Sequence, residues 1–308
     1  MLVSVVIPCY DSERSIREVV ELTMAEFGKM EGYECEFVLV NDGSPKDDTY
    51  GEIRRLAADY PCVHGINLMR NFGQHNAIMC GLNFAKGQLV LGMDDDLQNH
   101  PSQIRKLMRK MEEGGYDLVY GVFEEQQNTK AKYFSSWLNQ VTARKMLGRS
   151  KDIQTSSFWL ITSDLKDQVI QFKNYNPMIQ ALFTRLTNNV GNVVVQHHKR
   201  EYGSSGYTLG KLIKLWLAYF NYTVVPLRAI SLIGVVTAGV GFLAGIITII
   251  RKLLNASMPV GWASTICIML FFFGLVLLAL GIIGEYLADI VLSINSTPQY
   301  IVRETVNL

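Results

Sequence analysis

Two long uncharged runs occupy the last quarter of the chain and restrict what it can fold into. Residues 229–250 contain no charged side chain, and Arg228 and Arg251 flank this run. A helix of about 22 residues crosses the roughly 30 Å of hydrocarbon in a bilayer. A second run, 262–284, is of similar length. Core helices of soluble proteins are seldom apolar on every face over this length, so we predict two transmembrane helices within residues 229–291.

The part of the chain before these runs alternates short β-branched segments with longer segments of helical periodicity. The expected strands are 2–8, 35–40, 63–68, 89–93 and 116–121, and the expected helices are 12–29, 48–60, 74–85 and 103–113. This alternation predicts an α/β fold with a Rossmann-like, mostly parallel sheet. We assign this fold to a domain over residues 1–206, followed by the two-helix transmembrane hairpin.

Polar turns follow three of the predicted strands. Pro8-Cys-Tyr-Asp, Asn41-Asp-Gly-Ser and Asp94-Asp-Asp each stand at a strand end, so we expect them to meet at one edge of the sheet. Three adjacent carboxylates repel one another unless a cation neutralises them, which indicates a site for a divalent metal. The alternative is a solvated acidic turn that caps a helix starting near Pro101. We expect His100 to start that helix rather than to bind a metal.

Two further segments alternate Lys or Arg with Trp, Tyr and Phe, a pattern typical of helices that lie in a membrane interface. The first, 130–148, is equally well explained as a surface helix packed on the domain. The second, 207–228, leads directly into the first uncharged run, so we predict a juxtamembrane amphipathic helix there. Between them, residues 199–207 are basic and then rich in glycine and serine, which suits either a phosphate-binding loop or a plain linker.

The overall charge and the cysteines argue against two classes of protein. A formal net charge of +1 lacks the basic excess of a nucleic-acid-binding protein, so we expect no nucleic-acid partner. The five cysteines are odd in number, scattered and never spaced as Cys-x-x-Cys. This pattern favours free thiols in a reducing compartment over a disulfide framework or a zinc site.

Short motifs along the chain carry a family resemblance. They are Val5-Val-Ile-Pro-Cys-Tyr, Val40-Asn-Asp-Gly-Ser, Asn71-Phe-Gly-Gln, Met93-Asp-Asp-Asp-Leu-Gln and a Gly-Ser-x-x-Tyr loop at 203–207. Together they resemble inverting glycosyltransferases of family 2 with the GT-A fold. The later motifs are Pro226-Leu-Arg, Gly284-Glu-Tyr-Leu and Pro298-Gln-Tyr-Ile-Val. These resemble bacterial polyprenyl-phosphate sugar transferases, relatives of dolichyl-phosphate mannose synthase.

The resemblance extends over nearly the whole chain and implies an activity. It implies inverting transfer of a sugar from a UDP- or GDP-linked donor to undecaprenyl phosphate, with Mg²⁺ or Mn²⁺, for modification of cell-envelope glycans. It also implies a homo-oligomeric, multi-pass protein of the inner membrane, with the catalytic domain and the tail 292–308 in the cytoplasm. The stretch Arg70–Met79 is particularly similar to transferases that use a formamido-arabinose donor, and we interpret it as structural.

The resemblance places donor-binding residues in the strand-end turns. It implies that Pro8 and Tyr10 flank the base and ribose of the donor and that Asp42 recognises the base. Many relatives have Tyr-Asn-Glu after the first strand, whereas this chain has Tyr10-Asp-Ser-Glu. The contact to the ribose can therefore move to Asp11 or Glu13.

The acidic stretch matches the metal-binding motif of the family. Asp94 and Asp96 occupy the two acidic positions of its Asp-x-Asp motif, with Asp96 as the main metal ligand and Gln98 as a helper. Adjacent side chains on an extended strand end point to opposite faces. We therefore predict that Asp94 and Asp96 share the metal, and that Asp95 faces the ribose of the donor or the protein interior.

Basic residues are expected to hold the phosphates. Arg200 matches a residue near the reacting phosphates and completes a catalytic set with Asp94 and Asp96. Gly206 replaces a common lysine in the glycine- and serine-rich loop. The lipid phosphate is therefore assigned to Lys132, Lys199, Arg200 and Ser205.

Two departures from the family pattern leave alternatives open. Many relatives carry Gly-Asp-Phe-Arg-Leu with the Asp as a proposed base, but this chain has Ser156-Ser-Phe-Trp-Leu. Ser157 cannot act as a carboxylate base, although a lipid monophosphate is largely ionised at neutral pH and can attack without one. An arginine common after the fifth strand is also missing, since Gly121-Val-Phe-Glu stands there. The alternatives are an inactive nucleotide-sugar-binding membrane scaffold and a synthase with a non-lipid acceptor.

Overall fold

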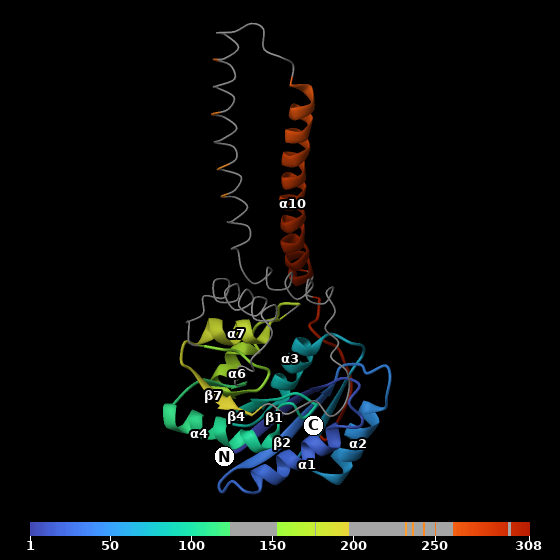
Figure 1. Cartoon of the computed structure of the whole chain (residues 1–308). Coiled ribbons are helices and arrows are strands. Elements are labelled where there is room, and N and C mark those ends of the chain that lie inside the picture. The colour runs from blue at the N-terminus through green and yellow to red at the C-terminus, as the bar shows by residue number, and fades with distance from the viewer. Residues whose placement is uncertain are drawn as a thin grey trace. The chain divides into compact units, whose positions relative to one another are not determined.

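The computed structural model describes residues 1–123, 153–175, 177–196, 261–294 and 297–308, with positions 232, 236, 243 and 250 in addition (Figure 1). The chain divides into two compact units. Unit 1 comprises Met1–Tyr207 and Ser296–Leu308, and unit 2 comprises Thr208–Asn295.

Unit 1 is built on a single sheet. The described strands are β1 (Leu2–Cys9), β2 (Glu34–Asn41), β3 (Val63–Leu68), β4 (Leu89–Gly92), β5 (Leu118–Phe123), β6 (Trp159–Thr162), β7 (Val190–Val195) and β8 (Val302–Val306). Their order is β7-β5-β6-β4-β1-β2-β3-β8. Strands β4, β1, β2 and β3 are parallel, as expected. The sheet as a whole is mixed, because β6 and β8 run antiparallel to their neighbours. The predicted α/β class is confirmed.

Helices cover both faces of this sheet. On one face lie α1 (Ile16–Phe27), α2 (Thr49–Asp59) and α4 (Ile104–Gly114), and on the other lie α3 (Gln74–Phe84), α6 (Ser163–Val169) and α7 (Ile179–Leu186). Strand β1 shows why: Val5 and Ile7 pack in the first cluster and Val6 in the second, as the period of two in a strand requires. Burial of both faces explains the nearly continuous apolar sequence of this strand.

A short 3₁₀ helix connects the acidic stretch to α4. This helix, η1 (Pro101–Gln103), begins after His100, whose Nδ1 accepts a hydrogen bond from the backbone amide of Ser102 at 3.2 Å. The predicted role of His100 at a helix start is confirmed. Proline occupies the first position, where a missing amide hydrogen costs nothing.

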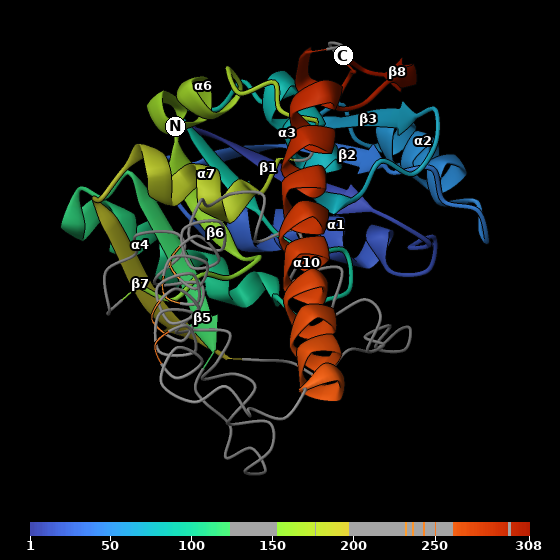
Figure 2. The same ribbon diagram turned by 90° about the horizontal axis from the view of Figure 1, so that it is seen from above.

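The C-terminal residues add an edge strand that was not predicted. Strand β8 pairs with β3 in antiparallel fashion, and Figure 2 shows the two strands side by side. The sequence pattern indicated only a tail over 292–308. Pairing between segments so distant in the chain depends on the assembled sheet rather than on local propensity.

Unit 2 contains the helix α10 (Trp262–Ile294), 33 residues long. Over the residues that the structure describes, no helix is both long and apolar enough to cross a membrane. The transmembrane hairpin stays a prediction, and most of the first run, 229–250, lies outside the described residues.

Candidate active site

The turns after β1, β2 and β4 meet at one edge of the sheet and line a cavity. This cavity has a volume of about 500 Å³. Its lining residues are Pro8, Cys9, Tyr10, Asp42, Asn71, Gly73, Gln74, Asp94, Asp95, Asp96, Gln98 and Ser157. The prediction that the three polar turns gather at one edge is confirmed, since the carboxyl ends of parallel strands lie together.

Asp42 is buried just after the end of β2, and both oxygens of its carboxylate accept hydrogen bonds from backbone amides. The amide of Phe72 donates to Oδ1 at 2.7 Å, and the amide of Gly73 donates to Oδ2 at 2.9 Å. Burial raises the pKa of Asp42, while these two hydrogen bonds lower it. The residue assigned to base recognition thus lines the cavity and also holds the loop that precedes α3.

Two glycines allow this loop to approach the turn after β2. Gly43 has a φ of +64°, and a Cβ atom there would lie 2.5 Å from the backbone carbonyl carbon of Arg70. Gly73 has a φ of 94° immediately before α3. Positive φ values favour glycine, which has no Cβ atom to clash. The close approach brings the amides of the loop within reach of Asp42.

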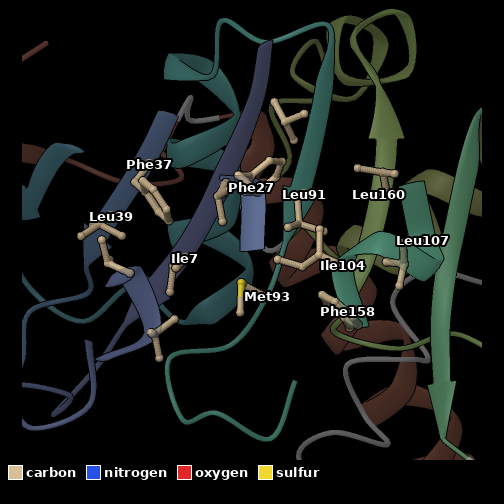
Figure 3. Close-up of a cluster of buried hydrophobic side chains, with 14 of the residues drawn as sticks. Ile7, Phe27, Phe37, Leu39, Leu91, Met93, Ile104, Leu107, Phe158 and Leu160 are labelled. Atoms are coloured by element: carbon tan, nitrogen blue, oxygen red, sulfur yellow. The ribbon is translucent and has the colours of Figure 1, made fainter. Parts of the chain in front are cut away.

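The acidic stretch is a loop rather than an extended strand end. Strand β4 ends at Gly92, and Leu97 has a left-handed backbone with a φ of 62°. Met93 and Leu97 are buried in the core cluster beside α1 and α4, and Figure 3 shows Met93 among Ile7 and Ile104. The premise that the three aspartates alternate between two faces does not hold, because the chain curls here and all three line the cavity.

Asp94 is surrounded by neutral donors from three segments of the chain. Gln74 Nε2 donates to Oδ1 at 2.9 Å, and Asn99 Nδ2 donates to Oδ2 at 3.0 Å. Ser157 Oγ donates a short hydrogen bond to the same Oδ2. Burial raises the pKa of Asp94, the charge of Asp96 adds to the rise, and the donated hydrogen bonds oppose it. The side chain is therefore held in one orientation.

Asp95 and Asp96 are held by backbone amides. The amide of Tyr10 donates to Asp95 Oδ2 at 3.1 Å, which ties the acidic loop to the end of β1. Burial, with the neighbouring charge of Asp94, raises the pKa of Asp95 to about 7. Asp96 is 9% exposed, and its Oδ1 accepts a hydrogen bond from the amide of Gln98 at 3.1 Å.

The cavity fits a cation that is shared with a bound phosphate. In the described part of the chain, no group of three or more His, Cys, Asp or Glu side chains is arranged to hold a metal ion alone. Mg²⁺ in nucleotide sites is usually bound by one or two carboxylates together with substrate phosphates and water. The half-buried carboxylate of Asp95 and the buried carboxylate of Asp96 on this wall suit such a site, because a cation would offset their mutual repulsion.

The two alternative ribose-binding residues face the turn after β2. Asp11 forms an ion pair with Lys46 at 3.3 Å, and Glu13 Oε2 accepts a hydrogen bond from the amide of Asp48 at 3.0 Å. Neither Asp11 nor Glu13 is among the residues that line the cavity. Pro8 and Tyr10, by contrast, lie in its wall.

The predicted phosphate-binding residues lie outside the described residues. They are Lys132, Lys199, Arg200 and Ser205. The predicted interfacial segments 130–148 and 207–228 lie outside the described residues as well.

Part of the cavity wall was not predicted from the sequence. The stretch Arg70–Met79 was interpreted as structural, whereas Asn71, Gly73 and Gln74 line the cavity. The position of this stretch in the chain could have indicated its role. It follows β3, which is parallel to β2 and therefore ends at the edge of the sheet where the cavity lies. No local sequence pattern indicated that Ser157 and Asn99 would contact Asp94.

Comparison with known proteins agrees with this geometry. Residues 4–169 match the model of the family described as Glycosyl transferase family 2. An undecaprenyl-phosphate 4-deoxy-4-formamido-L-arabinose transferase from Proteus mirabilis (strain HI4320) is 32% identical, over 99% of this chain and 94% of the relative. A protein of the same name from Edwardsiella ictaluri (strain 93-146) is 33% identical, with the same coverage.

Solved structures share the fold. Glucosyl-3-phosphoglycerate synthase from Mycobacterium tuberculosis, crystallised with UDP, superposes with a TM-score of 0.52 over 71% of this chain and 79% of that chain, at 18% identity. Mannosyl-3-phosphoglycerate synthase from Rubrobacter xylanophilus also gives 0.52, over 74% of each chain, at 15% identity. The family resemblance inferred from the motifs is confirmed: this chain is a glycosyltransferase that belongs to glycosyl transferase family 2.

Proposed function

We propose that this enzyme transfers a sugar from a nucleotide sugar to undecaprenyl phosphate, with inversion at the anomeric carbon. One observation carries the proposal: the acidic cavity lies at the strand ends of a chain whose undecaprenyl-phosphate transferase relatives match it over 99% of its length. The product would be a lipid-linked monosaccharide for cell-envelope glycans. A fold alone does not define a reaction, so each role below is assigned from the residues of the cavity.

The donor would lie across the three turns. Pro8 and Tyr10 supply one wall for the nucleoside, and the loop held by Asp42 supplies the other. Asp95 and Asp96, with Gln98 beside them, would hold Mg²⁺ or Mn²⁺ at the diphosphate, where such an ion supplies charge neutralisation of the leaving group. Asp94 orients Gln74 and Ser157 at the cavity wall through its hydrogen bonds.

The proposed chemical step needs no carboxylate base on the protein. An oxygen of the lipid phosphate forms the new bond to the anomeric carbon, and the bond from that carbon to the nucleoside diphosphate breaks. The attacking oxygen already carries negative charge at neutral pH, so no proton has to be removed. Ser157, whose hydroxyl donates a hydrogen bond to Asp94, is compatible with this chemistry.

The acceptor would enter from a membrane surface. We assign its phosphate to Arg200, with Lys132, Lys199 and Ser205 as further contacts, from the family resemblance and their positive or hydroxyl groups. We propose that the catalytic unit lies on the cytoplasmic side of the inner membrane, because nucleotide sugars are cytosolic. The uncharged runs 229–250 and 262–284 support the membrane hairpin, as do the exposed apolar side chains of α10.

The fold of unit 1 favours an even number of membrane crossings. Strands β7 and β8 belong to the same sheet, although residues 196–301 separate them in the chain. A polypeptide that leaves and rejoins one sheet on one side of a membrane must cross the membrane an even number of times. Two crossings, as proposed, satisfy this requirement.

A transfer assay tests the proposal directly. Purified full-length protein is incubated with Mg²⁺, undecaprenyl phosphate and a panel of radiolabelled UDP- and GDP-linked sugars. We expect label in the lipid fraction with one donor, loss of this label in Asp96→Ala, and no loss in Asp164→Ala, an exposed aspartate on α6.

Two other outcomes would favour other functions. Binding of a nucleotide sugar without transfer to any acceptor would favour a membrane scaffold. Transfer to a water-soluble acceptor, with undecaprenyl phosphate inert, would favour a synthase of another substrate class.

A further inference from the structure

The loop between β3 and α3 contributes much of the cavity wall but has little burial of its own. Asn71, Gly73 and Gln74 line the cavity. Met69, Arg70 and Asn71 are exposed. A segment with few buried contacts depends for its order on the hydrogen bonds at its two ends. One end is fixed by Asp42 through the amides of Phe72 and Gly73.

The other end of the loop is fixed by the C-terminal residues. The amide of Met69 donates to the carbonyl of Ile301 at 2.9 Å. The guanidinium Nη2 of Arg303 donates to the carbonyl of Met69 at 3.0 Å. Both backbone polar groups of Met69 are therefore satisfied by one short segment of chain.

A register shift in the sheet directs Arg303 onto this loop. Asn67 pairs with Glu304 and Leu68 pairs with Val302, so Arg303 has no partner across the ladder. Such bulges bend a strand and re-aim the side chain of the extra residue, often near functional sites. Here the side chain of Arg303 contacts Met69, the first residue after the end of β3.

The segment that carries Arg303 is itself anchored in unit 1. Gln299 is 7% exposed, and its Nε2 donates to the carbonyls of Phe172 at 3.0 Å and Asn174 at 2.7 Å. At the far end, Asn307 Nδ2 donates to the carbonyl of Val63 at 3.2 Å. The hydrogen bonds to Met69 are thus made by a strand that is fixed on both sides.

We propose that β8 is a positioning element of the donor site and that Arg303 is its principal positioning residue. The strand holds Met69, Met69 sets the start of the loop, and the loop places Asn71 and Gln74 in the cavity wall. The inference rests on the proposed function for its ligand, a nucleoside diphosphate with its sugar. It assigns to the C-terminal residues a role in donor binding rather than in the chemical step.

The test compares Arg303→Met with Arg109→Met in the full-length protein. Arg109 lies on α4 with its side chain 76% exposed and pairs only with Glu113 among the contacts described for it, so it is a matched surface arginine. We expect Arg303→Met to raise the KM for the nucleotide sugar and the Kd for UDP or GDP about 3- to 10-fold, with kcat changed less than about 2-fold. Arg303→Lys, which can still donate to the carbonyl of Met69, should recover part of the affinity.

Amide hydrogen exchange over residues 69–74 gives a readout that does not depend on activity. We expect faster exchange in Arg303→Met than in Arg109→Met. Equal exchange and equal KM in the two variants would overturn the proposal, and faster exchange with an unchanged KM would overturn the role in donor binding. If the unmodified protein neither binds nucleotide nor transfers sugar, the proposed function fails, while exchange still tests the anchoring of the loop by β8.

Discussion

Asp42 and Asp94, on two different walls of the cavity, are held in different ways. Asp42 is fixed by two backbone amides, those of Phe72 and Gly73. Asp94 is fixed by three neutral side chains, those of Gln74, Asn99 and Ser157. A backbone donor is removed only by a change to proline, so its geometry depends mainly on the path of the chain. Side-chain donors can be removed one at a time. The Asp42 side should therefore be sensitive to backbone changes, and the Asp94 side to single side chains.

The largest effect is expected from Gly43→Ala. Its Cβ atom would lie 2.5 Å from the backbone of Arg70 and would push the loop away from Asp42, with a φ of +64° adding strain. We expect the free energy of unfolding to fall by about 2–5 kcal/mol and nucleotide binding to be lost. Denaturant unfolding and calorimetry with UDP and GDP would measure both.

Gly32→Ala is the matched control for this substitution. Gly32 also has a positive φ, +81°, but a Cβ atom there would meet nothing within 4 Å. Its cost is that of the backbone strain alone. If Gly43→Ala were no worse than Gly32→Ala, the loop would not depend on close approach to the turn after β2.

A smaller effect is expected from the protonation of His75, at the start of the helix that follows this loop. This residue follows Gln74 in the first turn of α3, and burial lowers its pKa to about 4, from 6.5. Between these values the unfolded chain binds a proton that the folded protein does not, so stability falls as the pH falls from about 6.5 to 4. We expect a loss of up to about 3 kcal/mol over this range.

The loss attributed to His75 should be absent in a variant without an ionisable group. Urea unfolding of His75→Gln at several pH values would measure the difference in slope, whatever the cost of the substitution itself. Parallel pH profiles for the unmodified protein and His75→Gln would show that His75 does not hold this depressed pKa.

The same contrast explains what the sequence could predict. The turns at Pro8, Asn41 and Asp94 could be placed together because strand-helix alternation predicts parallel strands, whose carboxyl ends share an edge. Hydrogen-bond partners that lie far apart in the chain could not be predicted, in the cavity or in the sheet. Ser157 lies 63 residues from Asp94 in the chain, and Glu304, on β8, lies 237 residues from its partner Asn67. Contacts of this range depend on the assembled fold.

Local conformation also limited the prediction at the acidic stretch. Alternation of Asp94, Asp95 and Asp96 follows only if the strand continues, and β4 stops at Gly92. A left-handed leucine is an uncommon feature, and nothing in the sequence around Leu97 indicates it. That the three aspartates form one polar cluster could be predicted from the sequence, whereas the direction of each side chain could not.

The smallest effect is expected from Ser157→Ala, which tests the side held by side chains. Asp94 would lose one of its three donors and keep those from Gln74 and Asn99, so we expect the kcat/KM for sugar transfer to fall about 3- to 10-fold, the cost of one hydrogen bond of about 1 kcal/mol. Ser156→Ala is the control, because Ser156 Oγ accepts only the amide of Phe158 among the described contacts and does not line the cavity.

The variant Ser157→Asp turns this contrast into a test of mechanism. It introduces the carboxylate that the family resemblance implies at this position but puts a negative charge beside Asp94, which loses a donor and gains a repulsive neighbour. We expect a larger fall in kcat/KM than in Ser157→Ala, because the proposed attack by the lipid phosphate needs no base. A rise in kcat instead would mean that proton removal limits the reaction, and that the hydroxyl of Ser157 is a poor substitute for a base rather than the partner that holds Asp94.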